Sequence, residues 1–375
     1  MGFSEPSSCC GADLLAGKSY QAIGSLQLTR VMENNRMKTL TRRQFIKLSG
    51  TAVAIGLLPG CSTPAAPTPR LSREDVVKFH PDAPSKVVQA YHAGVWDGEE
   101  LVPEIIHQML DVSITTLTGL DDAREAWSIL FSPDERIAIK VNTLFSQDCT
   151  HLTLVMAIVQ SLQDVGIPAE QIVIFDARTS DLRNAGYPVN EDGPGVRCHG
   201  ANYTVGWTLA DTDIGLSGVL LDCDALINVP ILTGIVFFGA GISFAMKNHF
   251  GTFDKPQQFH GDRFLLGVTE VNALPPIKER TRLVIGDILT AGAYRSHYGR
   301  LVVGGNKLLM SFDPVALDTI GTQIAADAYA AEGSDSTVVA TQAAPWLARA
   351  AELGLGTDDP ETIDLMEVSL GLVQK

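Results

Sequence analysis

The sequence has few cysteines, and this shortage excludes several classes of protein. Only six of its 375 residues are cysteine, and none forms the CxxC pair that iron–sulfur clusters, zinc knuckles and thioredoxin-like redox centres need. We therefore expect no iron–sulfur cluster. Three cysteines lie beyond residue 61, too few for a disulfide framework, so we interpret Cys149, Cys198 and Cys223 as small buried side chains.

Long hydrophobic runs and common catalytic motifs are also missing from the second half of the chain. Residues 231–246 are uncharged but contain three glycines. They are too few to span a bilayer, which takes about 20 apolar residues, so we predict a buried loop leading into a helix. No GxSxG elbow, HExxH helix, P-loop or GxGxxG turn is present, which disfavours common hydrolase and dinucleotide chemistries.

The chain is poor in charge but acidic. Charged residues make up 19% of it and hydrophobic residues 45%, which indicates a globular protein with a large core. The formal net charge is -15, although residues 1–61 hold seven Lys and Arg against three Asp and Glu. The acidic remainder repels phosphate backbones and anionic lipids, so we expect no nucleic-acid binding and no charge-driven adsorption to membranes.

The amino-terminal segment carries an export pattern. Arg42 and Arg43 match the twin-arginine motif, and a short apolar stretch then ends at Cys61 in Leu-Pro-Gly-Cys, which resembles a bacterial lipobox. We predict a signal peptide over residues 37–60, a lipid on Cys61 and a Pro-rich tether over residues 61–85. The protein is thus expected to leave by the twin-arginine pathway and to be lipid-anchored to the outer face of a bacterial membrane.

Residues 1–36 do not fit this pattern, because export signals begin near the start of a chain. Met32 and Met37 lie just before the arginine pair. We therefore expect residues 1–36 to be a non-native upstream extension.

Apolar periodicity beyond the tether predicts one α/β domain over residues 86–375. Strand and helix patterns alternate with short connections, which predicts an open, mostly parallel sheet with helices on both faces. Residues 178–217, rich in Gly, Asp and Asn, are predicted to be an insertion or lid. The predicted strands are residues 86–92, 136–141, 171–175, 226–229, 282–286 and 307–312, and the predicted helices are residues 99–117, 152–165, 243–248, 264–274 and 314–330.

Polar residues lie at the ends of four predicted strands. In open α/β sheets, ligands bind beyond the carboxyl ends of the strands, so we expect these side chains to meet at one edge. Each has a structural alternative, since a lysine can extend along an edge strand and an aspartate can cap the following helix. The residues are Lys140, Asn142, Asp176, Asn228 and Asp287.

A second group of polar residues follows the uncharged run. Lys247 and Asn248 emerge from apolar surroundings, and His260 follows shortly after. Removing an ammonium from water costs several kcal/mol, so a negative group is expected beside Lys247. The alternative is a helix with Lys247 in its last turn and Gly251 as its cap. Asp313 and His151 are interpreted as residues that begin helices.

Taken in order, these motifs resemble the domain of unknown function 362 family, many of whose members are exported lipoproteins. The resemblance extends from about residue 87 to residue 330 and implies a fold and a site, but no established reaction. Members usually carry a lysine and a histidine shortly after the Asn-x-Pro motif, and residues 231–235 lack both. The matching segments are Lys140-Val141-Asn142, Asp176, Ile227-Asn228-Val229-Pro230, Lys247-Asn248-His249-Phe250-Gly251, Phe259-His260 and Asp313-Pro314-Val315-Ala316-Leu317-Asp318.

We expect an enzyme-like domain that acts on a small anionic molecule, with a divalent metal as a candidate cofactor. One alternative is a non-catalytic lipoprotein that binds a solute or partner, and another is a redox subunit with an organic cofactor such as a flavin. The expected catalytic residues are Lys247, Asp176 and His260, the ligand-binding residues Lys140, Asn142, Asn228 and Asn248, and the metal ligands Asp176, Asp287 and His260.

Export is predicted to depend on the arginine pair and membrane attachment on the lipidated cysteine. Replacing Arg42 and Arg43 by lysine should keep the protein in the cytoplasm, and Cys61→Ser should release the exported protein from the membrane. Cell fractionation with immunoblotting measures both. Export of the lysine variant, or retention of the serine variant on the membrane, would contradict the prediction.

Overall fold

The computed structural model describes residues 73–74, 84–296 and 299–371, which belong to one compact unit, Thr68–Lys375. The predicted export signal, Cys61 and most of the tether lie outside the described residues. Within the described part, no helix is both long enough and apolar enough to cross a membrane.

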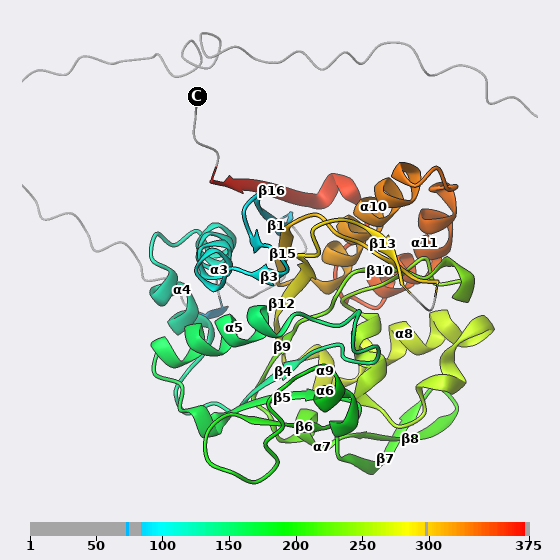
Figure 1. Ribbon diagram of the computed structural model, residues 1–375. Helices are drawn as coiled ribbons and strands as arrows, with labels where there is room; N and C mark the ends of the chain where they lie inside the picture. Colours follow the sequence, from blue (N-terminus) through cyan, green and yellow to red (C-terminus); the bar gives the residue numbers. More distant parts are fainter. Residues whose placement is uncertain (1–72, 75–83, 297–298, 372–375) are drawn as a thin grey trace, which may run out of the picture. The chain divides into compact units, whose positions relative to one another are not determined.

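An eight-stranded sheet crosses the domain in the order β16-β1-β15-β12-β9-β4-β5-β6 (Figure 1). Only β15 runs antiparallel to its neighbours, so the predicted open, mostly parallel sheet is confirmed. The six predicted strands are present, whereas β6 and β16 were not predicted. The strands are β1 Ser85–His92, β4 Ile137–Lys140, β5 Ile172–Asp176, β6 Arg197–Gly200, β9 Ala225–Asn228, β12 Thr281–Ile288, β15 Lys307–Ser311 and β16 Ile363–Leu370.

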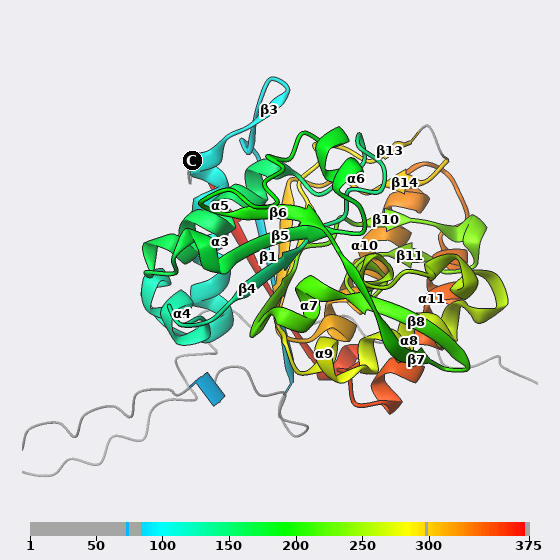
Figure 2. The ribbon, with the colours of Figure 1, turned by 90° about the horizontal axis from the view of Figure 1, so that it is seen from below.

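Helices cover both faces of the sheet, as predicted. The central strands are therefore buried on both sides. Along β4, Ile137 and Ile139 pack in the core beneath α3, α4 and α5, while Ala138 packs in the core beneath α8, α10 and α11 (Figure 2). The helices are α3 Pro103–Thr118, α4 Ala123–Leu130, α5 Leu152–Asp164, α6 Thr179–Asn184, α7 Gly218–Asp222, α8 Phe264–Ala273, α9 Pro275–Lys278, α10 Pro314–Ala331 and α11 Thr337–Glu352.

Smaller sheets and 3₁₀ helices accompany the main sheet. Residues 178–217 were predicted as an insertion or lid, but they contribute β6 to the main sheet as well as the β7–β8 hairpin. The uncharged residues 231–246 were predicted as a buried loop leading into a helix, but they contribute β10 and β11 to a four-stranded sheet of order β11-β10-β14-β13. The remaining elements are β2 Trp96–Asp97, β3 Glu100–Leu101, β7 Tyr203–Leu209, β8 Thr212–Ser217, β10 Thr233–Gly234, β11 Ile242–Ser243, β13 Tyr294–Arg295, β14 Leu301–Val302 and the 3₁₀ helices η1 Ala169–Gln171, η2 Val236–Phe238, η3 Lys247–Thr252, η4 Pro256–Phe259, η5 Gly261–Arg263 and η6 Pro360–Thr362.

The helix predicted over residues 243–248 is wrong, and a buried carboxylate explains the difference. Asp318 of α10 has no exposed surface, and it accepts hydrogen bonds from the backbone N–H groups of Ala245 (2.7 Å) and Met246 (2.9 Å). Burial raises the pKa of Asp318 to about 7, against the lowering effect of these two hydrogen bonds. This contact holds residues 244–246 in a turn, and η3 then begins at Lys247.

Asp313 and His151 begin helices, as predicted. Asp313 caps α10 by accepting hydrogen bonds from the N–H groups of Val315 and Ala316. His151 is the residue before α5, but its side chain makes no capping hydrogen bond and turns to a different partner, described below.

Candidate functional site

A cavity of about 430 Å³ opens where β4 and β5 end. Six of the predicted site residues line it, whereas Asn228 and Asp287 do not. Those six are Lys140, Asn142, Asp176, Lys247, Asn248 and His260.

The floor of the cavity is a buried ion pair between Lys140 and Asp176. Their side chains are 1% and 6% exposed, and the ammonium lies 2.8 Å from Oδ1 of the carboxylate. Lys140 Nζ also donates to the Val141 carbonyl oxygen (2.7 Å) and to Asn248 Oδ1 (3.1 Å), which uses all three of its protons. Burial lowers the pKa of Lys140, while Asp176 opposes the change.

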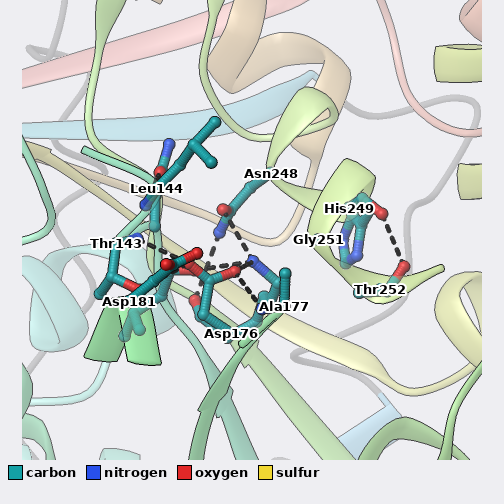
Figure 3. A network of polar contacts seen from close by, with 12 residues as sticks. Thr143, Leu144, Asp176, Ala177, Asp181, Asn248, His249, Gly251 and Thr252 are labelled. Carbon is teal, nitrogen blue, oxygen red and sulfur yellow. Dashed lines mark hydrogen bonds and ion pairs between the residues drawn. The ribbon is translucent and has the colours of Figure 1, made fainter. Parts of the chain in front are cut away.

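The carboxylate of Asp176 also has all its hydrogen-bonding positions filled (Figure 3). Its Oδ2 accepts from the backbone N–H (2.6 Å) and the hydroxyl (2.8 Å) of Thr143, and its Oδ1 accepts from Ala177 N–H (2.7 Å) as well as from Lys140. Four hydrogen bonds fill the lone-pair positions of a carboxylate. Asp176 is therefore suited to positioning the cavity floor, and not to the catalytic role predicted for it.

Strand register explains why Asn228 supports the floor without lining the cavity. Lys140 and Asn228 are paired residues on the adjacent parallel strands β4 and β9. Asn248 spans them, because its Nδ2 donates to Asn228 Oδ1 (2.7 Å) while its Oδ1 accepts from Lys140. Asn228 Nδ2 donates to the Ala245 carbonyl oxygen (2.8 Å) and contacts His249 Nε2 (3.4 Å). Burial, together with the Lys140 charge, lowers the pKa of His249 to about 3, so this imidazole is neutral.

Gly251 allows η3 to approach this ion pair. A Cβ atom there would lie 2.6 Å from Asp176 Oδ1 and 2.7 Å from Lys140 Nζ, closer than non-bonded atoms come. Both atoms belong to a buried pair that cannot move away without losing hydrogen bonds. The glycine is thus required by close packing, not by the helix cap considered from the sequence.

Lys247 lies on the wall of the cavity without an anionic partner. The Lys247 residue is half-buried, and no carboxylate among the described residues lies within 4 Å of its ammonium, which is 4.9 Å from the centroid of the Phe250 ring. Burial, together with the nearby Arg300 guanidinium, lowers the pKa of Lys247 to about 8. The negative group expected beside Lys247 is therefore not supplied by the described part of the protein.

Arg300 is a second cation on the wall, and no sequence motif predicted it. Its guanidinium donates to Asp148 Oδ2 at 3.1 Å and lies 3.9 Å from the centroid of the Phe145 ring. Asp148 also accepts a hydrogen bond from the Tyr294 hydroxyl (2.8 Å). Arg300 thus contributes positive potential near Lys247 while its own charge has a carboxylate partner.

His260 completes the wall as a neutral imidazole. Its Nδ1 lies 3.0 Å from the Pro256 carbonyl oxygen, which only accepts hydrogen bonds, so Nδ1 carries the proton and Nε2 is the acceptor. Burial and the Lys247 charge lower the pKa of His260, against the effect of the Pro256 carbonyl. The ring packs edge-to-face against Phe250, with centroids 5.3 Å apart.

The predicted metal-ligating set of Asp176, Asp287 and His260 is not assembled. Asp287 is fully buried and bonds to His151, whose Nδ1 lies 2.8 Å from Oδ2 and 3.0 Å from Oδ1 of the carboxylate. Although burial acts to lower it, the pKa of His151 is raised by Asp287. In the part of the chain that the structure describes, no three His, Cys, Asp or Glu side chains are grouped to hold a metal ion. These residues do not fit the expected divalent metal.

The segment that lacks the family lysine and histidine forms part of the cavity wall. Thr233 and Gly234 form β10, and Ile235 lines the cavity. A Cβ atom on Gly234 would lie 2.4 Å from Cε2 of Tyr329, so this backbone is tightly packed. The apolar side chain of Ile235 therefore forms this part of the wall.

Residues 137–323 match the family described as "Domain of unknown function (DUF362)", which supports assigning this domain to that family. No curated protein matches the chain. Among solved structures, the chain is similar to the lactate racemase apoprotein from Thermoanaerobacterium thermosaccharolyticum, at a TM-score of 0.37 and 10% identity. The similarity covers 62% of this chain and 55% of that one, so the chain spans about half the length of its neighbour.

The buried ion pair predicts a strong coupling between its two members. Lys140→Met should lower the free energy of unfolding by about 3–5 kcal/mol, because it leaves the Asp176 carboxylate buried without a cation. Adding Asp176→Asn should recover about 1–3 kcal/mol of that loss. Urea denaturation of the four proteins measures the coupling.

The exposed pair Arg349–Glu352 on α11 provides the control, since the same cycle there should give less than about 1 kcal/mol. Additive effects of the Lys140 and Asp176 substitutions would show that the two residues act independently.

Proposed function

We propose that the cavity binds a small anionic molecule and that Lys247 is its counter-ion. The observation that carries this proposal is the ammonium of the half-buried residue Lys247, which has no carboxylate within ion-pair distance among the described residues and lies near a second cation, Arg300. A charge placed this way destabilises the folded protein unless an anion joins it. Ligand sites of this kind are concave and mostly apolar with a few polar groups, as here.

Within this function, His260 is the group suited to exchange a proton with the bound molecule. It is neutral, its Nε2 is an acceptor, and it lines the same cavity as Lys247. The ion pair of the floor would hold the cavity in shape without binding the ligand, since all its donors and acceptors are already used within the protein. A non-catalytic solute-binding role is the second candidate, favoured by the engagement of Asp176 in four hydrogen bonds.

We also propose that the domain works outside the cytoplasm as a twin-arginine-exported lipoprotein of its family. Support comes from the arginine pair, the short apolar stretch and the lipobox-like sequence at Cys61, followed by a Pro-rich tether. A tethered domain with an open cavity could take a solute directly from its surroundings.

Replacing Lys247 by methionine should separate binding from folding. Methionine retains most of the stem's volume and removes the charge, so affinity for small carboxylates or phosphates should fall about tenfold or more. The free energy of unfolding should rise by about 1–3 kcal/mol at pH 7, because the folded original protein holds this lysine at a pKa of about 8 instead of its ordinary value of 10.5. Calorimetric titration and urea denaturation measure the two effects.

Lys278→Met, at an exposed lysine outside this cavity, is the matched control and should change neither quantity. If Lys247→Met unfolded the protein, or left anion affinity unchanged, the lysine would have a structural role instead.

Anion affinity should also depend on pH in a defined direction. The anion binds the protonated form of Lys247, so affinity should be constant below about pH 8 and fall about tenfold per pH unit above it. Because the pKa of His260 is lowered, this imidazole stays neutral and should not produce the transition. In Lys247→Arg the decline should disappear, since arginine stays protonated. Affinity that does not change between pH 7 and 10 in the original protein would exclude Lys247 as the counter-ion.

A further inference from the structure

One positive side chain of the cavity lining has no ion-pair partner among the described residues. Among the four lysines and arginines that line it, three have a carboxylate partner and Lys247 has none among the described residues. A ligand with a single negative charge matches this arrangement, whereas a doubly charged phosphate would bring a second charge near the lining carboxylates Asp181 and Asp254. The paired cations are Lys140 with Asp176 (2.8 Å), Arg178 with Asp181 (2.8 Å) and Arg300 with Asp148 (3.1 Å).

The wall next to this charge is aromatic. The Lys247 ammonium lies 4.9 Å from the centroid of Phe250, and the Phe250 ring meets His260 at 5.3 Å and 80°. Phe238 meets the same imidazole at 5.9 Å and 61°. Aromatic rings prefer such edge-to-face or offset contacts, so a flat ring in the cavity could extend this packing.

Large apolar side chains at the cavity remain in contact with water. Phe238 is 48% exposed and Leu144 is 53% exposed, and both line the cavity. Phe237, 52% exposed, packs against Phe238 but does not line the cavity. Exposed apolar groups gathered at one cavity indicate a surface that a ligand covers.

From the unpaired lysine and the aromatic wall we propose that the ligand is an aromatic carboxylate. Its carboxylate pairs with Lys247, and its ring packs among Phe238, Phe250 and His260. The cavity volume, about 430 Å³, lies within the range of small-molecule sites and exceeds the need of an isolated carboxylate group. This inference rests on the anion-binding function proposed above and specifies its ligand class.

The test compares four probes on the full-length protein by calorimetry or ligand-observed NMR: benzoate, cyclohexanecarboxylate, acetate and inorganic phosphate. Benzoate should bind at least about tenfold more tightly than acetate, because the ring buries apolar surface. Cyclohexanecarboxylate should lie between them, because it has the bulk but not the flat π-system. Phosphate should bind more weakly than benzoate.

Two variants locate the ring. Phe238→Leu should weaken benzoate binding about threefold to tenfold and leave acetate binding unchanged, since leucine lacks the aromatic contact. Phe237→Leu, at the neighbouring exposed phenylalanine, should change neither. Benzoate binding that Phe238→Leu leaves unaltered would overturn the assignment of the ring.

The outcomes separate this inference from the proposed function. If acetate or phosphate bound as tightly as benzoate and Lys247→Met abolished that binding, the aromatic ligand class would be wrong and the anion site would stand. If none of the four probes showed Lys247-dependent binding, both proposals would be wrong.

Discussion

The buried ion pair between Lys140 and Asp176 is the constraint on which the candidate site depends. Removing two charges from water costs several kcal/mol for each ion unless every hydrogen-bonding position is filled. Here the ammonium uses its three protons, and each carboxylate oxygen accepts two hydrogen bonds. The partners come from the loops after β4 and β5 and from η3. The pair therefore fixes three separate segments at the carboxyl edge of the sheet, and it leaves room beside itself only for a glycine at position 251.

The hydrogen-bonding groups of the floor are all paired within the protein, so the contacts of the proposed ligand would come from the wall. η3 serves both parts, since Asn248 hydrogen-bonds into the floor while its neighbour Lys247 lines the wall. The sequence predicted a negative partner for Lys247, whereas Lys140 was expected to bind the ligand. Lys140 has a negative partner within the protein, whereas Lys247 has none among the described residues and keeps a lowered pKa instead. Retaining a destabilising group in this way is typical of residues kept for function and not for stability.

Local pattern was enough to predict the sheet and the edge where the cavity opens, because strand periodicity and the rule for parallel strands need no knowledge of distant contacts. It could not predict partners far apart in the chain. Asp287 bonds to His151 across 136 residues and Arg300 to Asp148 across 152, and no spacing in the sequence indicates either pair. The wrong prediction of a helix over residues 243–248 has the same origin. Asp318, more than 70 residues away in the chain, accepts hydrogen bonds from backbone N–H groups of this segment. Tertiary contacts override local propensity at the site, where polar groups are buried.

The lowered pKa of Lys247 also constrains what chemistry the cavity can support. An anion beside the ammonium favours its protonated form, so binding raises the pKa of Lys247 and draws a proton from solvent near pH 8. In the bound state the lysine is therefore a fixed positive charge and a poor proton donor. His260 differs, because its hydrogen bond to Pro256 fixes the proton on Nδ1 and the Lys247 charge disfavours a second proton. In the proposed complex, Lys247 would hold the ligand's charge, and proton exchange, where a reaction needs it, would fall to Nε2 of His260.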